Sequence, residues 1–133
     1  NRQRRLLKMK VKMKPADKKF SYYIRLRDGK CMRCGSLVII NLETGMPKSH
    51  QASHFHSRWK QSTRMDPDNV DTLCFPCHRL WGGDERAKYK KFKIKQLGQK
   101  GFDALTLRAN SYKKKDYEMD LIIANELLKS VLL

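Results

Sequence analysis

Acidic side chains and long apolar runs are both scarce in this sequence. Its 133 residues include 13 Asp and Glu against 30 Lys and Arg, which gives a formal net charge of +17. No apolar run approaches the length needed to cross a bilayer, and the basic N-terminal stretch lacks the apolar core of a signal peptide. We therefore expect a single small domain outside the membrane, with a modest hydrophobic core.

The excess of positive charge indicates a polyanionic partner, since without one it would only add self-repulsion. Nucleic acid is the first choice. An anionic membrane surface fits less well, because no segment combines its basic residues with a broad Trp, Phe and Leu face. The charge is uneven along the chain: residues 1–19 and 86–115 are strongly basic, and residues 116–128 carry acids but no Lys or Arg.

Cysteine is also sparse, and all four residues fall in two Cys-x-x-Cys pairs, Cys31 with Cys34 and Cys74 with Cys77. Two thiolates on one tight turn can occupy two corners of a tetrahedron, so two such pairs predict a structural zinc site. Disulfides are the alternative, but the expected location is a reducing cytoplasm, where thiols bind zinc instead. The 39 residues between the pairs exceed an ordinary zinc-ribbon loop, so a folded insertion is expected there.

Hydrophobic periodicity predicts an α+β fold. We expect a basic arm (1–15), a zinc-bound domain (16–110) and a C-terminal helix used for packing or dimerisation (111–133). The expected elements are a helix at 16–28 capped by Asp17, strands at 37–42 and within 48–57, a turn at 66–69, a helix starting near His78, and helices at 84–97 and 116–130. The ββα-metal nuclease architecture consists of two strands followed by a helix, held by zinc at their base, and here we expect further helices to flank it.

Three residues inside or beside the cysteine frame predict a hydrolytic site. His54 is the candidate general base, because an imidazole can take a proton from water at neutral pH. Asn69 is expected to hold the loop that carries this base, although Asp-Pro-Asp-Asn is also an ordinary turn. His78 is expected to bind a divalent cation beside a phosphate. A zinc-ligand role and an unused histidine are the other interpretations of His78.

Weaker candidates surround these three residues. His56 and Asp84 are candidates for further metal ligands, with solvent exposure and a helix N-cap as the respective alternatives. Trp59 and Trp81 are interpreted as core residues, with Trp59 as an alternative wedge in opened DNA. Basic residues expected to contact DNA phosphates are Arg58, Lys60, Arg64, Lys88, Lys91 and Lys95.

Several motifs together resemble the NinG/Rap recombination endonucleases of lambdoid phages. They are FSYYIRLRD at 20–28, CMRCG at 31–35, QASHF at 51–55 and TRMDPDNV at 63–70. The resemblance implies an HNH-like, ββα-metal nuclease that acts on D-loops and Holliday junctions with a divalent cation. It matches His54 to the general base, Asn69 to the central asparagine and His78 to the metal-binding position. Ser53 stands where many HNH enzymes have an aspartate ligand.

We therefore expect a zinc-containing DNA endonuclease that uses Mg²⁺ or Mn²⁺ and cuts branched DNA, in the bacterial host cytoplasm if it is encoded by a phage. A generic HNH nuclease on duplex DNA and a catalytically silent zinc module that binds nucleic acid are the alternatives. A homodimer is also expected, because symmetric junction cutting needs two sites and the apolar face of the last helix needs a cover.

Overall fold

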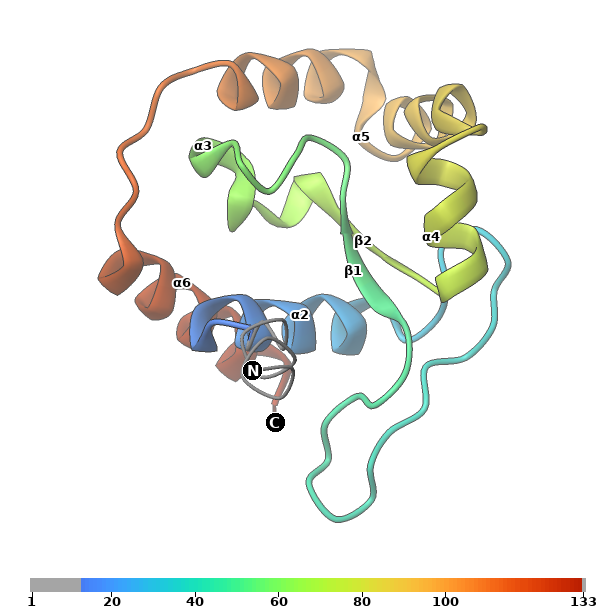
Figure 1. Ribbon diagram of the computed structural model, residues 1–133, viewed down its shortest axis with the longest axis vertical. Helices are drawn as coiled ribbons and strands as arrows, with labels where there is room; N and C mark the ends of the chain where they lie inside the picture. The colour runs from blue at the N-terminus through green and yellow to red at the C-terminus, as the bar shows by residue number, and fades with distance from the viewer. Residues whose placement is uncertain (1–12, 133) are drawn as a thin grey trace, which may run out of the picture.

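The computed structural model describes residues 13–132, so most of the expected basic arm lies outside the described residues. The chain is mixed α and β, and none of its described helices is long and apolar enough to cross a membrane. In chain order the elements are α2 (Pro15–Asp28), β1 (Gln51–His54), α3 (Gln61–Arg64), the 3₁₀ helix η1 (Pro67–Asn69), β2 (Val70–Leu73), α4 (Phe75–Gly82), α5 (Arg86–Ala109) and α6 (Tyr117–Val131) (Figure 1).

Strands β1 and β2 form an antiparallel pair, and α4 follows directly after β2. The register places His54 opposite Val70 and Gln51 opposite Leu73. Of the two expected strands only the one within 48–57 forms, as β1, and its partner β2 was not expected to be a strand.

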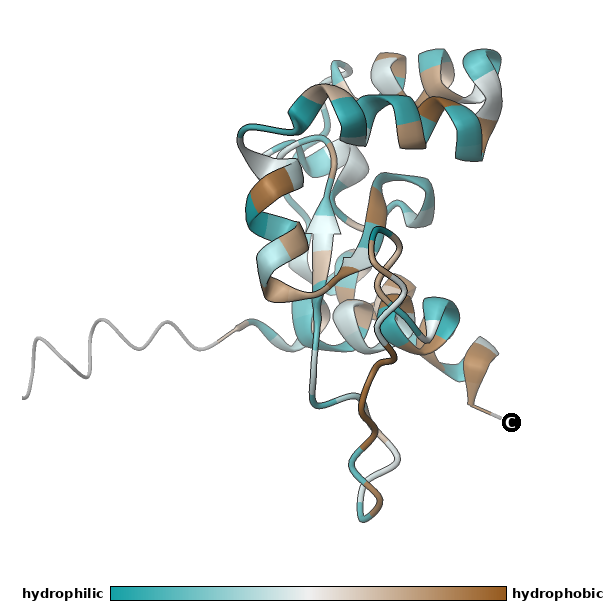
Figure 2. Cartoon of the chain, turned by 90° about the vertical axis from the view of Figure 1, so that its right-hand side faces the viewer, coloured by the Kyte–Doolittle hydropathy of each residue, from teal (hydrophilic) through white to brown (hydrophobic). Residues whose placement is uncertain are grey.

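The strand predicted at 37–42 does not form. Only isolated bridges, Lys30 with Leu37 and Ile40 with Pro47, occur in the long connection between α2 and β1. This connection extends away from the other elements, and its apolar stretch is visible in Figure 2. Leu37 and Leu42 are 76% and 95% exposed. Apolar β-formers without a neighbouring strand or core do not assemble into a sheet, since β propensity depends on packing.

Helix α2 extends from Pro15 to a C-terminal stop at Gly29, as its sequence predicts. Gly29 has φ 69°, a conformation that glycine adopts without the steric penalty of a Cβ atom, and its N–H donates to the carbonyl of Arg25. The predicted cap by Asp17 is wrong: Lys14 holds the N-cap position without a side-chain bond, and the Asp17 carboxylate pairs with Arg64.

Helix α6 packs lengthwise on α2 (Figure 1). The shared cluster joins Phe20 and Ile24 of α2 to Ala124 of α6, with Leu121 and Leu127 packed against it. The predicted inward face also included Tyr117, which is instead 39% exposed. The face that we expected a second copy to cover is therefore covered by the same chain, and this reason for a homodimer no longer holds.

Helix α5 is longer than the predicted 84–97 and is broken at Gly98, whose φ of 75° and ψ of 163° are not helical. The predicted stop is therefore an internal break, after which the helix resumes in a new direction. The segment after Gly98 buries Phe102, Leu105 and Ala109. Their spacing of three and four residues is helical, so the sequence pattern already indicated a helix beyond residue 97.

The first segment of α5 contributes a lysine to the core. Lys93 and Asp71 of β2 both have 0% exposed side chains, and Nζ lies 3.0 Å from Oδ2. Gln96 donates to the other carboxylate oxygen at 3.0 Å, and the Tyr89 hydroxyl lies 3.0 Å from Oδ2. Burial lowers the pKa of Lys93, which the Asp71 charge opposes. Because each partner satisfies the other's charge, this network attaches α5 to the hairpin.

Substituting Lys93→Met should lower the free energy of unfolding by about 3–5 kcal/mol, because it leaves the Asp71 carboxylate buried without its counter-ion. Lys91→Met is the matched control, since Lys91 is exposed on the same helix. Urea denaturation of the zinc-loaded proteins measures both. Equal stability of the two variants would contradict the structural role of the pair.

Candidate active site and metal centre

The four cysteines converge, as their spacing predicts. The sulfurs of Cys31, Cys34, Cys74 and Cys77 all lie within 4.8 Å of one another, and those of Cys34 and Cys74 are 3.7 Å apart. A tetrahedron with Zn–S bonds of about 2.3 Å has S···S edges of about 3.8 Å. The geometry therefore fits one tetrahedral zinc ion bound by four thiolates.

The surroundings of the cluster shift the pKa values of its thiols in opposite directions. The guanidinium of Arg33 lies 3.3 Å from the sulfur of Cys77, and the backbone N–H of Cys34 donates to the sulfur of Cys31 at 3.5 Å. Hydrogen bonding with Ser36 lowers the pKa of the Cys34 thiol to about 6, whereas burial raises the pKa of Cys77 to about 12. A bound cation would supply the charge that Cys77 needs to ionise.

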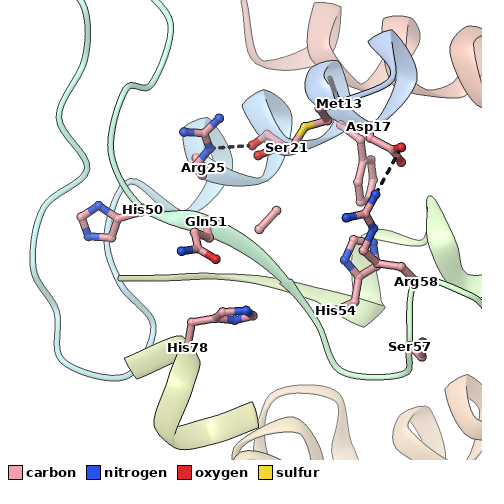
Figure 3. A pocket seen from close by; sticks show the side chains of 12 residues that line it. Met13, Asp17, Ser21, Arg25, His50, Gln51, His54, Ser57, Arg58 and His78 are labelled. Atoms are coloured by element: carbon pink, nitrogen blue, oxygen red, sulfur yellow. Dashed lines mark hydrogen bonds and ion pairs between the residues drawn. The ribbon is translucent and has the colours of Figure 1, made fainter. Parts of the chain in front are cut away.

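His54 and His78 line one cleft of about 540 Å³. His54 is the last residue of β1, and His78 extends from the first half of α4 toward β1 (Figure 3). Arg25 and Asp17 of α2 and Arg58 of the loop after β1 also line the cleft. The structure therefore brings two of the three predicted catalytic residues together, although 24 positions separate them in the sequence.

The imidazole of His54 is held in one tautomer. Its Nε2 lies 3.0 Å from the backbone carbonyl of Arg64, which can only accept, so Nε2 carries the proton. With the proton on Nε2, Nδ1 keeps its lone pair, and among the described residues it makes no hydrogen bond. Burial, with a further contribution from the charges of Arg58 and Arg64, lowers the pKa of His54 to about 4. The ring is consequently neutral at pH 7 and available to accept a proton.

Asn69 is fully buried, and both the oxygen and the nitrogen of its side-chain amide form hydrogen bonds with backbone groups. Its Oδ1 accepts from the N–H of His56 at 2.8 Å, and its Nδ2 donates to the carbonyls of His56 at 3.0 Å and Thr63 at 3.2 Å. These contacts join the start and end of the loop that follows His54. Asn69 does not line the cleft, so its geometry suits positioning of the loop and not contact with a reacting group.

Asp17 and Arg64 form a bidentate pair behind the base, which the sequence patterns did not reveal. The distances are 3.0 Å from Nε to Oδ1 and 2.7 Å from NH2 to Oδ2. Burial opposes ionisation of Asp17, but the hydrogen bonds and charges of Arg64 and the charge of Arg58 keep its pKa below the ordinary value. Because the Arg64 carbonyl accepts from His54, the pair ties the base to helix α2.

The guanidinium of Arg64, expected to contact DNA phosphates, is thus occupied by Asp17, and its side chain is only 12% exposed. Lys60 is partly occupied, since its Nζ donates to the Asn110 side chain at 3.0 Å. Arg58 remains 52% exposed at the cleft, 3.5 Å from Asp17. Lys88, Lys91 and Lys95 are exposed along α5, outside the residues that line the cleft.

His78 fits a cation site in part. Burial lowers the pKa of His78, so the ring is neutral at pH 7, and its buried Nδ1 has no hydrogen-bond partner among residues 13–132. In that part of the chain, however, only the four cysteines form a cluster of three or more His, Cys, Asp or Glu donors. A cation at His78 would therefore complete its coordination with water and substrate phosphate, as Mg²⁺ commonly does.

The structure does not bring His56 and Asp84, the expected further ligands, into the cleft of His78. His56 turns toward α5, where its Nε2 lies 3.3 Å from the Thr106 hydroxyl, and its ring packs edge-on against Phe55. Asp84 is exposed and lines a separate hollow with Arg79 and Leu80. Neither residue lines the cleft of His54 and His78. The alternation along β1 ends at His54, so His56 does not continue on the same face.

The HNH endonuclease family model matches residues 31–82, which is less than half of the chain. A search of curated proteins and a search of solved structures gave no match. The matched segment contains all four cysteines and, among the residues that line the cleft, His50, His54 and His78. This match supports a nuclease that acts on DNA and uses a divalent metal, whereas it says nothing of branched DNA, recombination or the NinG/Rap family.

The purified chain should contain one zinc ion, and removing it should unfold residues 31–82, because metal binding and folding are coupled at such sites. Cys74→Ser should reproduce the effect, and Ser36→Ala, beside the cluster, is the control that keeps four thiolates. Metal analysis and thermal unfolding measure the two quantities. A zinc-free chain with an unchanged thermal transition would contradict the assignment.

His54 should remain neutral down to about pH 5, with its ring NMR signals shifting only toward pH 4. A free histidine has a pKa of about 6.5, so between about 6.5 and 4 the unfolded chain binds a proton that the folded chain does not. Stability should therefore fall as pH decreases through this window. His54→Gln should reduce that slope relative to the unsubstituted zinc-loaded protein. Titration of the His54 ring near pH 6.5 would contradict the buried, neutral state.

Proposed function

We propose that the chain is a metal-dependent DNA endonuclease that hydrolyses phosphodiester bonds in the cleft between His54 and His78. The observation that carries this proposal is a neutral imidazole, fixed in one tautomer, in the same cleft as a second neutral imidazole. The match of residues 31–82 to HNH endonucleases supports it. The strand, strand and helix formed by β1, β2 and α4 support a ββα-metal arrangement.

In this mechanism Nδ1 of His54 takes a proton from the water that attacks the phosphorus atom. The bond between Nε2 and the Arg64 carbonyl keeps the ring oriented and stabilises the imidazolium that forms. Asp17 contributes through Arg64 by compensating the positive charge behind the base. Arg58, partly exposed at the cleft, is placed to contact a phosphate oxygen.

His78 would hold the catalytic cation. When bound, Mg²⁺ or Mn²⁺ supplies charge that stabilises the transition state and the leaving 3′ oxygen. His78 contributes a neutral nitrogen from a helix whose N-terminus is attached to the zinc centre through Cys74 and Cys77. The zinc site therefore positions the metal ligand and takes no part in the chemistry.

Branched DNA is the substrate that we favour within this class, on the basis of the motifs shared with the NinG/Rap endonucleases. The same resemblance underlies the proposed recombination role in a bacterial cytoplasm. Duplex DNA remains the alternative substrate, and a zinc module that binds DNA without cutting it is the alternative from another class.

His54→Ala should lower the cleavage rate by about 10²–10⁴-fold, because it removes the proton acceptor while leaving the phosphate contacts. His78→Ala should also be inactive at ordinary metal concentration, but it should regain part of its rate when Mn²⁺ is raised. Single-turnover cleavage of a four-way junction and of linear duplexes with the same sequence measures both. His56→Ala is the control, since this histidine lies two positions from the base and faces α5.

Reactions without added Mg²⁺ or Mn²⁺ provide the metal-free baseline, since a strong chelator would also remove the structural zinc. Cleavage by His54→Ala at the unsubstituted rate would refute the assignment of the base. Binding without cleavage by every protein, at all metal concentrations, would establish the silent module. Equal rates on junction and duplex would reject branched-DNA preference and leave the nuclease proposal intact.

A further inference from the structure

The two tryptophans of this chain have opposite environments. Trp81 is 6% exposed and stacks on Tyr89 with ring centroids 4.7 Å apart. Trp59 is 91% exposed in the loop between β1 and α3. One exposed apolar side chain is ordinary, but Trp59 has an aromatic neighbour: Tyr112, which is 92% exposed, lines the same hollow.

This hollow, of about 380 Å³, separates the loop of Trp59 from the chain that leaves α5. Lys60 and Lys113 line it beside the two aromatic rings, and no acidic residue of the described part of the chain does. Its two walls are joined, because Lys60 Nζ donates to the Asn110 side chain at 3.0 Å and the Ser62 hydroxyl donates to the Ala109 carbonyl at 3.4 Å.

The backbone that presents Trp59 is fixed by hydrogen bonds. Its own N–H donates to the Ser57 hydroxyl at 3.2 Å, and the N–H of Lys60 donates to the Ser57 carbonyl at 2.9 Å. The carbonyl of Arg58 accepts from the guanidinium of Arg64 at 3.1 Å. An aromatic ring on a fixed turn loses little conformational entropy on binding, which favours its use as a contact.

The aromatic surface is continuous with the cleft of His54. A second hollow, of about 540 Å³, shares Asp17 and Arg58 with that cleft and includes Trp59, Lys14 and Lys115. It connects the cleft to the hollow of Trp59 and Tyr112. Its one acidic residue, Asp17, is already paired with Arg64 and Arg58. A path of cations and aromatic faces therefore extends from the proposed base to Tyr112.

We propose that this path binds unpaired DNA, with a base stacked on Trp59 and the phosphates along the lysines and Arg58. Alternating cations and aromatic faces suit single strands, whose bases expose their faces, whereas a duplex hides them. A protein partner fits less well, because interface centres are depleted in lysine. This proposal rests on the proposed nuclease function, because the path begins at the proposed active-site cleft. It adds that Trp59 gives the protein a preference for DNA with unpaired bases.

The test compares the affinity for a thymidine oligomer of about 15 nucleotides with that for a blunt duplex of equal length, without added Mg²⁺ or Mn²⁺. Trp59→Ala should weaken binding of the oligomer by about 5–100-fold and change duplex affinity by less than about two-fold. Trp59→Phe should restore most of the loss. Leu42→Ala, which removes a side chain that is 95% exposed in the distant 29–50 connection, should have no effect on either substrate.

Tryptophan fluorescence gives a second measurement. Because Trp81 is buried, quenching on addition of the oligomer should come from Trp59 and should be absent in Trp59→Phe. Equal losses for oligomer and duplex in Trp59→Ala, or no loss for either, would overturn the proposal, and the second result would favour a protein partner. Neither measurement requires cleavage, so a chain that binds the oligomer through Trp59 but never cuts DNA would refute the nuclease alone.

Discussion

The short strand β2 is the constraint on which the rest of the structure depends. All four of its residues are fully buried, so each polar group along it needs a partner inside the protein. Helix α2 supplies two: Arg27 donates to the Val70 carbonyl at 2.7 Å, and the Asp28 carboxylate accepts from the N–H of Thr72 at 2.9 Å. Helix α5 supplies the counter-ion of Asp71. An unpaired buried polar group destabilises a protein by about 1–3 kcal/mol, so separating either helix from β2 would be strongly unfavourable.

The site depends on this buried strand at both of its ends. Asn69 precedes β2 and holds the loop after His54, while Cys74 follows β2 and begins the helix that carries His78. His54 itself pairs with Val70 across the sheet. The proposed base and the proposed metal ligand are therefore attached to one rigid segment, one through strand pairing and the other through the cysteine cluster. Such attachment to regular elements maintains a catalytic geometry better than a mobile loop does.

Positive charge has two separate uses in this chain. Arg27, Arg64 and Lys93 satisfy buried or half-buried groups and contribute to the fold. The exposed lysines of α5 and of the segment after it face solvent, where they can attract a polyanion over a long range. Net charge alone indicates a polyanionic partner, but it overstates how many cations can reach such a partner. The cations nearest the proposed base illustrate the division, since Arg64 is internal and Arg58 is half exposed.

The sequence by itself determined the features that depend on neighbouring residues or on composition. The two Cys-x-x-Cys turns, the helix stop at Gly29, the strand within 48–57 and the net charge are of this kind. Only the tertiary structure decided that Asp17 pairs with Arg64, 47 positions away, that residues 37–42 form no strand, and that His56 and Asp84 lie outside the cleft. These outcomes depend on which distant groups meet. Lys93 resembles its neighbours in the sequence, and only its meeting with Asp71 makes it a core residue.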